Sequence, residues 1–239
     1  MRSSARRPAR AVPARPGRVR HFFRELVGLL GEALVTLGAF CLLFAAWQLW
    51  WTDVVADQDS AQVISTMETS GNGWVQPNAV ELGDAFAIVR IPRFGEDYAR
   101  PIYEGTTRDI LKRGVGHYEQ SVMPGQVGNF SLAGHRVTYG KPFNRIAELV
   151  PGDKVIIETV DTYYVYTIVS SEIVLPTDVR VVLPVPNQPG AKPTQAMLTM
   201  TSCHPEFSSR ERYVQHAVLD QTLPRAGGLP PEVLAVSNP

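Results

Sequence analysis

The hydrophobic pattern begins with one long apolar run, Leu26 to Trp51, in which Glu32 is the only charged side chain. About 20 apolar residues are needed for an α-helix to cross the hydrocarbon core of a bilayer. Three tryptophans gather at the C-terminal end of the run, where indole rings suit the headgroup layer. The pattern predicts a single transmembrane anchor over residues 25–52.

Two alternatives to this anchor are a cleaved signal peptide and a buried core helix. A signal peptide has a shorter apolar region and small residues at its cleavage site, whereas this run ends in Trp-Gln-Leu-Trp-Trp-Thr-Asp. A core helix would not be expected to follow eight arginines. Both features favour an uncleaved anchor.

After the anchor, residues 53–83 are mostly polar and contain a Ser-Gly-Asn-Gly break, which is typical of a stalk. Residues 84–223 consist of short β-branched and aromatic segments separated by Gly and Pro, and they predict the folded domain. The last residues, 224–239, are rich in Pro and Gly and are expected to form a flexible tail.

The clearest hairpin joins Asp153–Thr159 to Thr162–Val169, because both segments favour strand and only two residues separate them. The loop Pro184–Pro193 is expected to interrupt any ladder. Short helical turns are expected at Arg108–Gly114 and Phe143–Leu149. Further strands are expected at Ala85–Ile91, Asn129–Val137, Ile173–Leu175, Ala196–Cys203 and Arg212–Leu219. Many short strands with few helices predict an all-β barrel or sandwich.

The composition is close to that of globular proteins, with 44% hydrophobic and 19% charged residues, which excludes a wholly disordered, collagen-like or multi-span chain. The 23 basic and 23 acidic residues balance, but not locally. Residues 1–52 hold eight Arg and two Glu, a formal charge of +6, and the remainder carries −6. By the positive-inside rule, residues 1–24 form a cytoplasmic basic tail and the folded domain lies outside the cell membrane. We expect the tail to bind anionic lipid of the bilayer rather than nucleic acid.

The chain has two cysteines, and only one of them lies in the predicted exported domain. Cys41 falls within the anchor, so Cys203 has no partner for an internal disulfide. A lone thiol in an oxidising compartment needs either burial or a function. Cys203 ends a predicted strand, where a nucleophile can be held rigidly and still be reached.

A nucleophilic thiol needs a proton acceptor or a cationic neighbour. His117, His135, His204 and His216 all lie in the predicted domain, and composition alone does not choose among them. For an oxyanion partner, Arg212 is nine residues beyond the cysteine. If it starts a strand antiparallel to that of the cysteine, it returns close to the thiol, whereas Arg210 falls in the preceding loop. No cluster has metal-ligand spacing, so we predict no metal and no cofactor.

Several motifs resemble those of the sortase family. Thr199-Met200-Thr201-Ser202-Cys203 resembles the signature Thr-Leu-x-Thr-Cys, Ala133-Gly134-His135 resembles the histidine motif, and Arg212-Tyr213-Val214 resembles the arginine before the final strand. The phrases Gly-His-Tyr at 116–118, Met-Pro-Gly-Gln-Val-Gly-Asn at 123–129 and Gly-His-Arg-Val-Thr-Tyr-Gly-Lys-Pro-Phe at 134–143 are similar to class E sortases of high-GC Gram-positive bacteria. The resemblance covers roughly residues 84–222. Met200 and Ser202 depart from the usual Leu and Thr.

The resemblance implies an eight-stranded sortase-like β-barrel and cysteine transpeptidation. By it, Cys203 attacks the Thr–Gly carbonyl of a sorting signal on a secreted protein, His135 exchanges protons with the amines, and Arg212 stabilises the oxyanion. The acceptor implied is an amine of the peptidoglycan cross-bridge or its lipid-linked precursor. Class E resemblance favours a Leu-Ala-x-Thr-Gly signal over Leu-Pro-x-Thr-Gly. The residues expected to bind substrate are Tyr118, Tyr139, Thr201 and Ser202, with Tyr118 the first choice for sensing the second position.

Two rival hypotheses remain at this point. An L,D-type transpeptidase would also be exported and β-rich, but it carries Ser-x-Gly-Cys, and Thr-Ser-Cys-His lacks that glycine. A non-catalytic anchored β-domain would need no reactive thiol. Acylation of Cys203 by a sorting peptide distinguishes both from a sortase.

Overall fold

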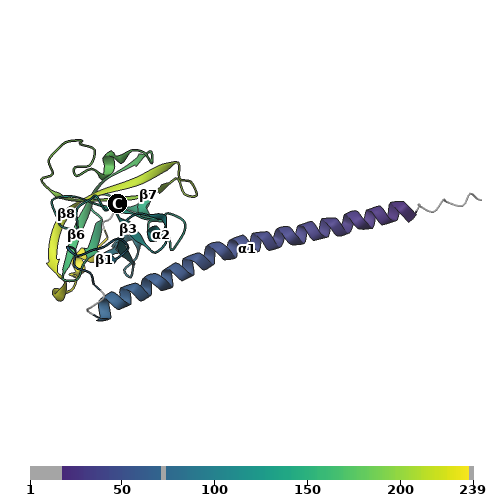
Figure 1. The fold of residues 1–239 in the computed structure, drawn as a ribbon, viewed down its shortest axis with the longest axis horizontal. Helices are drawn as coiled ribbons and strands as arrows, with labels where there is room; N and C mark the ends of the chain where they lie inside the picture. The colour runs from purple at the N-terminus through teal and green to yellow at the C-terminus, as the bar shows by residue number, and fades with distance from the viewer. Residues whose placement is uncertain (1–17, 71–73, 237–239) are drawn as a thin grey trace, which may run out of the picture. The chain divides into compact units, whose positions relative to one another are not determined.

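A computed structural model describes residues 18–70 and 74–236 of the chain. Eight strands close into a barrel in the order β1-β2-β3-β4-β7-β8-β6-β5 (Figure 1), so the predicted eight-stranded barrel is confirmed. The strands are β1 (Ala85–Arg90), β2 (Ala99–Glu104), β3 (Val115–His117), β4 (Gly128–Ala133), β5 (Lys154–Glu158), β6 (Thr162–Val174), β7 (Ala196–His204) and β8 (Glu211–Pro224). The helical segments are α1 (Arg18–Ser70), α2 (Arg108–Leu111), α3 (Pro231–Leu234) and the 3-10 turns η1 (Pro92–Phe94), η2 (Ile146–Glu148), η3 (Val179–Val182) and η4 (Arg225–Gly227).

The predicted hairpin is present as β5 and β6, which pair antiparallel. The expected separate strand Ile173–Leu175 is wrong, because β6 continues to Val174 along the full length of β8. Strands β2 and β3 were not expected. β3 has only three residues, too few to show an alternating pattern, and it is held between β2 and β4 by its hydrogen-bonded ladders.

Strand alternation decides which side chains of β7 fill the barrel and which face outward. Leu198 and Met200 are fully buried members of the main core. Successive side chains of a strand point to opposite faces. Thr199, Thr201 and Cys203 therefore lie on the outer face of β7, beside the strands β4 and β8 that flank it.

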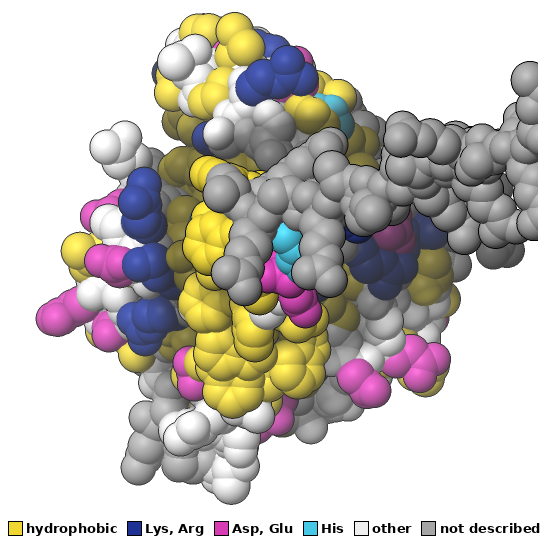
Figure 2. Space-filling model, turned by 90° about the vertical axis from the view of Figure 1, so that its right-hand side faces the viewer, with side chains coloured by type: hydrophobic (Ala, Val, Ile, Leu, Met, Phe, Trp, Pro, Cys, Tyr) yellow, Lys and Arg dark blue, Asp and Glu magenta, His cyan; other side chains and the backbone are white. Residues whose placement is uncertain are grey.

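Helix α1 is 53 residues long, and its first part is apolar and solvent-exposed. Figure 2, in which this end of α1 faces the viewer, shows hydrophobic side chains gathered around it. The helix is long and apolar enough to cross a membrane, as the predicted anchor requires. Residues 1–17 of the predicted basic tail lie outside the described residues.

The predicted stalk differs from the structure, because α1 continues without a break to Ser70. The chain divides into two units after Gln48, so the last turns of α1 belong with the barrel. Met67 of this part packs with Trp74 and Ile88 in a small apolar cluster. From sequence, the residues of the predicted stalk could start as a continuation of the anchor helix, but their polar composition and the Ser-Gly-Asn-Gly break favoured a stalk and did not reveal the apolar face that packs on the barrel. Residues 71–73, the expected break, are outside the described residues.

The C-terminal segment also differs from the flexible tail that was expected. It holds η4 and α3, and Val233 of α3 is 1% exposed against Ile156 and Val165. The Nε atom of Arg225 donates to Glu158, 2.7 Å away. Apolar burial and this charge-assisted bond fix a segment whose Pro and Gly content suggested disorder. Residues 237–239 are outside the described residues.

Candidate active site

Cys203 lies near the end of β7, directly opposite Arg212 in the antiparallel ladder with β8. The expected return of Arg212 beside the cysteine is therefore present, and both residues belong to the outer face of the barrel. The thiol is partly exposed. Together with His135, Phe207 and Ser208, it lines a cavity of about 400 Å³.

His135 follows β4 in a loop, residues 134–142, that turns back beside the end of β7. The N–H of Gly134 donates to the carbonyl of Thr201 at 3.1 Å, which extends the β4–β7 pairing by one residue. A Cβ on Gly134 would lie 2.6 Å from the buried ring of Phe143, so the close approach requires glycine. Burial lowers the pKa of His135 from its ordinary value of 6.5. The imidazole is thus held neutral in the cavity that Cys203 also lines.

The guanidinium of Arg212 is held at the start of β8. Its Nη1 atom donates to the carbonyls of Ser209 and Glu211 at 3.0 and 2.9 Å. A guanidinium has five N–H donors, so these two bonds from one nitrogen leave donors for a ligand. Arg210 precedes β8 and is exposed, as expected from the spacing.

Tyr118 and Thr201 contact each other through their hydroxyls. The two hydroxyls are 3.2 Å apart, and the Thr201 hydroxyl also donates to the carbonyl of Leu132 at 3.1 Å. Tyr118 lines a second cavity of about 540 Å³, whose opposite wall is formed by Val179 and Val182 of η3. Tyr118 of the β3–β4 connection therefore shares this cavity with η3 of the β6–β7 connection, and Thr201 of β7 contacts its hydroxyl.

Tyr139 and Ser202 occupy different surroundings. The Tyr139 ring lies 5.2 Å from the His135 ring, between centroids, so it contacts the candidate proton-transfer residue. Ser202 is 2% exposed, and its hydroxyl donates to the carbonyl of Gly134 at 2.8 Å. The Ser202 hydroxyl therefore holds the histidine loop, and the contact of Ser202 with substrate stays a prediction.

Comparison with known proteins decides the family. The family model described as a sortase domain matches residues 89–220. The chain belongs to the sortase family. It is 40% identical over 238 residues to Sortase SrtE1 of Streptomyces coelicolor, spanning 96% of this chain and 65% of that relative. Sortase SrtE2 of the same organism is 34% identical over 225 residues, covering 87% and 86% of the two chains.

A solved structure supports the same assignment. The structure of sortase E1 from Streptomyces coelicolor with a tripeptide in the active site is 39% identical and superposes with a TM-score of 0.58. The match covers 63% of this chain and 96% of that one. The predicted class E sortase is thus confirmed. Sortases are cysteine transpeptidases, so the family assignment favours an enzyme over a binding module.

Arg136 follows the histidine of the Gly-His-Arg motif directly, and the sequence alone assigns it no role. In this sortase it is 6% exposed, and its Nη1 atom donates to the carbonyl of Cys203 at 3.3 Å. Its Nε atom donates to the carbonyl of Asn144 at 2.9 Å, and Nη2 lies 3.5 Å from Glu206. Arg136 therefore ties the end of β7 to the histidine loop. Its place next to the histidine is the one sequence signal that could have identified it.

The other histidines of the domain are held in different places. His117 is buried, with Nδ1 2.7 Å from Glu104 and Nε2 2.8 Å from Ser121. His204 packs on the ring of Tyr213 at 5.7 Å, and His216 is 3% exposed on β8. His135 is the histidine that shares a cavity with Cys203.

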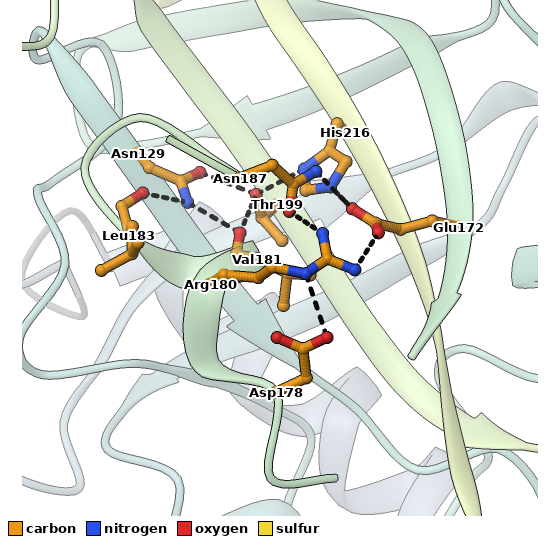
Figure 3. Close-up of polar contacts among 9 residues, drawn as sticks. All are labelled: Asn129, Glu172, Asp178, Arg180, Val181, Leu183, Asn187, Thr199 and His216. Atoms are coloured by element: carbon orange, nitrogen blue, oxygen red, sulfur yellow. Dashed lines mark hydrogen bonds and ion pairs between the residues drawn. The ribbon is translucent and has the colours of Figure 1, made fainter. Parts of the chain in front are cut away.

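His216 belongs to a polar network that fastens the β6–β7 connection to the barrel (Figure 3). Its Nε2 atom donates to Glu172 at 3.0 Å, and its Nδ1 atom is 2.9 Å from the Thr199 hydroxyl. The same carboxylate accepts from Asn187 at 2.6 Å and pairs with Arg180 of η3 at 2.8 Å. The network holds η3, and with it one wall of the cavity that Tyr118 lines.

Glu172 is ionised in this network. Burial alone would raise its pKa, but hydrogen bonds from Asn187, His216 and Arg180, and the charge of Arg180, outweigh burial and hold the pKa below its ordinary value. The stabilisation is present above the ordinary pKa of a glutamate and is lost as the pH falls through the lowered value.

Glu172→Ala is expected to lower the free energy of unfolding of the barrel by about 1–3 kcal/mol, because it leaves the buried His216 nitrogen without its acceptor. Thermal unfolding of the full chain in detergent, followed by near-UV circular dichroism, measures the change. Glu96→Ala is the control, since Glu96 is exposed, and it should change the stability by less than about 0.5 kcal/mol. Equal stability of the two variants would contradict the assigned role of the network.

Metal binding finds no support in the described residues. Within 18–70 and 74–236, no group of three or more His, Cys, Asp or Glu side chains could hold an ion. The chemistry available around Cys203 is that of its own thiol, the His135 imidazole and the Arg212 guanidinium.

Proposed function

We propose that this sortase cleaves a Leu-Ala/Pro-x-Thr-Gly sorting signal between Thr and Gly and transfers the acyl group to a cell-wall amine. The observation that carries the proposal is the placement of Cys203, which is opposite Arg212 in the β7–β8 ladder and lines one cavity with His135. Acyl transfer through a thioester uses a nucleophile, a proton-transfer group and an oxyanion donor. Cys203, His135 and Arg212 can supply them. Attachment of secreted proteins to peptidoglycan is the outcome.

In the first half-reaction, the Cys203 thiol passes its proton to neutral His135, and the sulfur attacks the carbonyl carbon of the signal threonine. The carbonyl oxygen becomes an oxyanion, which the Arg212 guanidinium stabilises through N–H donors and fixed charge. When the tetrahedral intermediate collapses, the C–N bond to glycine breaks and His135 gives its proton to the departing amine. The product is a thioester between Cys203 and the threonine.

In the second half-reaction, an incoming amine attacks the thioester carbonyl. Neutral His135 accepts the proton that the amine loses and passes it to the Cys203 sulfur, as the C–S bond breaks and the new amide forms. Phe207 and Ser208 of the β7–β8 connection line the same cavity, and we expect the acceptor amine to approach past them. The enzyme returns to its starting state, with Cys203 as a free thiol and His135 as a neutral imidazole.

The lowered pKa of His135 predicts the pH profile. As the pH falls, His135 becomes an imidazolium, which can no longer accept the proton of the thiol. Because burial lowers the pKa of His135 below 6.5, the acid limb of kcat/KM is expected to have its midpoint below pH 6.5. Peptide cleavage measured from about pH 4.5 to 9 tests this. An acid midpoint above 6.5 contradicts it.

The cavity beside Tyr118 is the proposed seat of the sorting signal. Its wall is mainly apolar on the η3 side, with Val179, Val182 and Leu183, which suits the leucine and alanine of the signal. Tyr118 remains the first choice for sensing the second position, with Thr201 beside it and Tyr139 as the runner-up. The solved sortase E1 of Streptomyces coelicolor has a tripeptide in its active site, which supports a peptide ligand for this chain.

We further propose a single-pass membrane protein with a cytoplasmic N-terminus and an extracellular catalytic domain. The apolar part of α1 and the charge difference between residues 1–52 and the remainder support this topology. The substrates are then secreted proteins with C-terminal sorting signals, and the acceptor is an amine of the peptidoglycan cross-bridge or its lipid-linked precursor.

Mass spectrometry of an acyl-enzyme is the experiment that tests the proposal. The full chain in detergent is incubated with Leu-Ala-Ala-Thr-Gly and Leu-Pro-Ala-Thr-Gly peptides, quenched in acid and digested. A mass increase on the Cys203 peptide equal to the fragment ending in threonine supports a sortase of the proposed specificity. An unmodified Cys203 with both peptides, under conditions in which the thiol reacts with an alkylating reagent, would contradict it.

A further inference from the structure

The part of α1 just beyond its apolar run contacts the loop that carries His135. The Oδ1 atom of Asp53 accepts the backbone N–H of Gly140 at 3.2 Å, and its Oδ2 atom pairs with the Lys141 ammonium at 2.8 Å. The Asp53 side chain is 19% exposed, so solvent screens this pair less than a surface one. One carboxylate thus holds two consecutive residues of the histidine loop.

A second set of contacts lies one turn further along the helix. Arg100 of β2 donates through Nη2 to Asp57 at 2.8 Å and to the carbonyl of Gly140 at 3.4 Å. A Cβ on Gly140 would lie 3.2 Å from the Cβ of Ala56, so glycine allows the helix and the loop to approach closely. Helix, strand and loop therefore meet at Gly140.

The backbone at this contact is strained. Tyr139, Gly140 and Lys141 have φ angles of 53°, 70° and 37°, three successive residues in the left-handed region. Only glycine adopts that region without a steric cost, so Tyr139 and Lys141 persist there only where the surroundings hold them. The carboxylate of Asp53 supplies such a restraint at the middle and last residues of the turn.

The strained turn is connected to the imidazole. The Tyr139 ring lies 5.2 Å from the His135 ring, and the N–H of Phe143 donates to the carbonyl of His135 at 3.1 Å, which closes the loop. A change at residues 139–141 moves the tyrosine against which the imidazole rests. The position of His135 therefore depends on the turn that α1 holds.

We propose that Asp53, assisted by Asp57, is a positioning residue that couples the membrane-proximal helix to the catalytic histidine. Its carboxylate stabilises the left-handed turn at 139–141, and the turn fixes the His135 imidazole beside Cys203 through Tyr139. The inference rests on the proposed function for its effect on turnover, while the docking of the loop stands on the contacts alone.

The test uses the full chain in detergent micelles and a quenched fluorescent peptide containing Leu-Ala-Ala-Thr-Gly. Asp53→Ala is expected to lower kcat by roughly ten- to a hundredfold with KM changed less than about twofold, because a displaced proton-transfer group affects the chemical step and not peptide binding. Asp53→Glu, which keeps a carboxylate, is expected to recover most of kcat. Glu68→Ala is the matched control, since Glu68 also pairs α1 with the barrel, through Arg90 at 2.7 Å, and should retain wild-type kcat.

Hydrogen exchange of the peptide spanning 134–143 gives a readout that does not depend on activity. Asp53→Ala should accelerate its exchange and Glu68→Ala should not. Wild-type kcat in Asp53→Ala, or an equal loss in Glu68→Ala, overturns the inference, since the second result would mean that any loosening of α1 has the same effect. If the wild type does not cleave the peptide, the proposed function fails, and unchanged exchange in Asp53→Ala then overturns the docking inference separately.

Discussion

Cys203→Ala is expected to abolish cleavage of a Leu-Ala-x-Thr-Gly peptide, lowering turnover by roughly 10⁴-fold or more, and to prevent acyl-enzyme formation. The reaction proceeds through a bond between carbon and the Cys203 sulfur, and the methyl group of alanine cannot form it. His135 and Arg212 can still bind or polarise the peptide, but no covalent intermediate follows. Fluorescent peptide turnover and mass spectrometry of the quenched protein measure the two effects.

The second cysteine provides the control for this variant. Cys41 is exposed on the apolar part of α1 and lies outside the catalytic unit. Cys41→Ala should keep full turnover and should still be acylated at Cys203. Because Cys203 is only partly buried, its replacement should leave thermal unfolding of the barrel almost unchanged. Full turnover by Cys203→Ala would end the sortase mechanism for this chain.

The core of the candidate site could be predicted because it depends on short-range geometry. Cys203 and Arg212 are separated by a tight connection between two strong strands, so a nine-residue spacing leads to direct pairing in the antiparallel ladder. The alternation of side chains then assigns both residues to the outer face. His135 could not be chosen in this way, since β4 pairs with β7 across more than 60 residues, and the family motif was needed to identify it.

The features that could not be predicted depend on tertiary contacts. β3 exists because β2 and β4 lie on either side of it, and three residues carry no detectable periodicity of their own. The bond from the Ser202 hydroxyl to the carbonyl of Gly134, just after β4, joins residues 68 positions apart and has no local sequence signal. The helical continuation of α1 to Ser70 likewise depends on an apolar face, including Met67, that packs on the barrel. Such contacts override local propensity.

Arg212→Ala is expected to lower kcat/KM by about 10²- to 10³-fold, the size of the loss when one oxyanion donor is removed. Arg212→Lys should recover little, because an ammonium has neither the planar fork nor the spread charge of a guanidinium. The split between kinetic constants separates two roles, since Arg212 also donates to the carbonyls of Ser209 and Glu211. Loss of oxyanion stabilisation lowers kcat, whereas a loosened β7–β8 connection that binds peptide poorly raises KM. Arg210 lies in the same connection and is the control, so Arg210→Ala should change kcat/KM by less than about twofold. If Arg210 were essential and Arg212 dispensable, the assignment of Arg212 as the oxyanion donor, which rests on its pairing with Cys203, would be refuted.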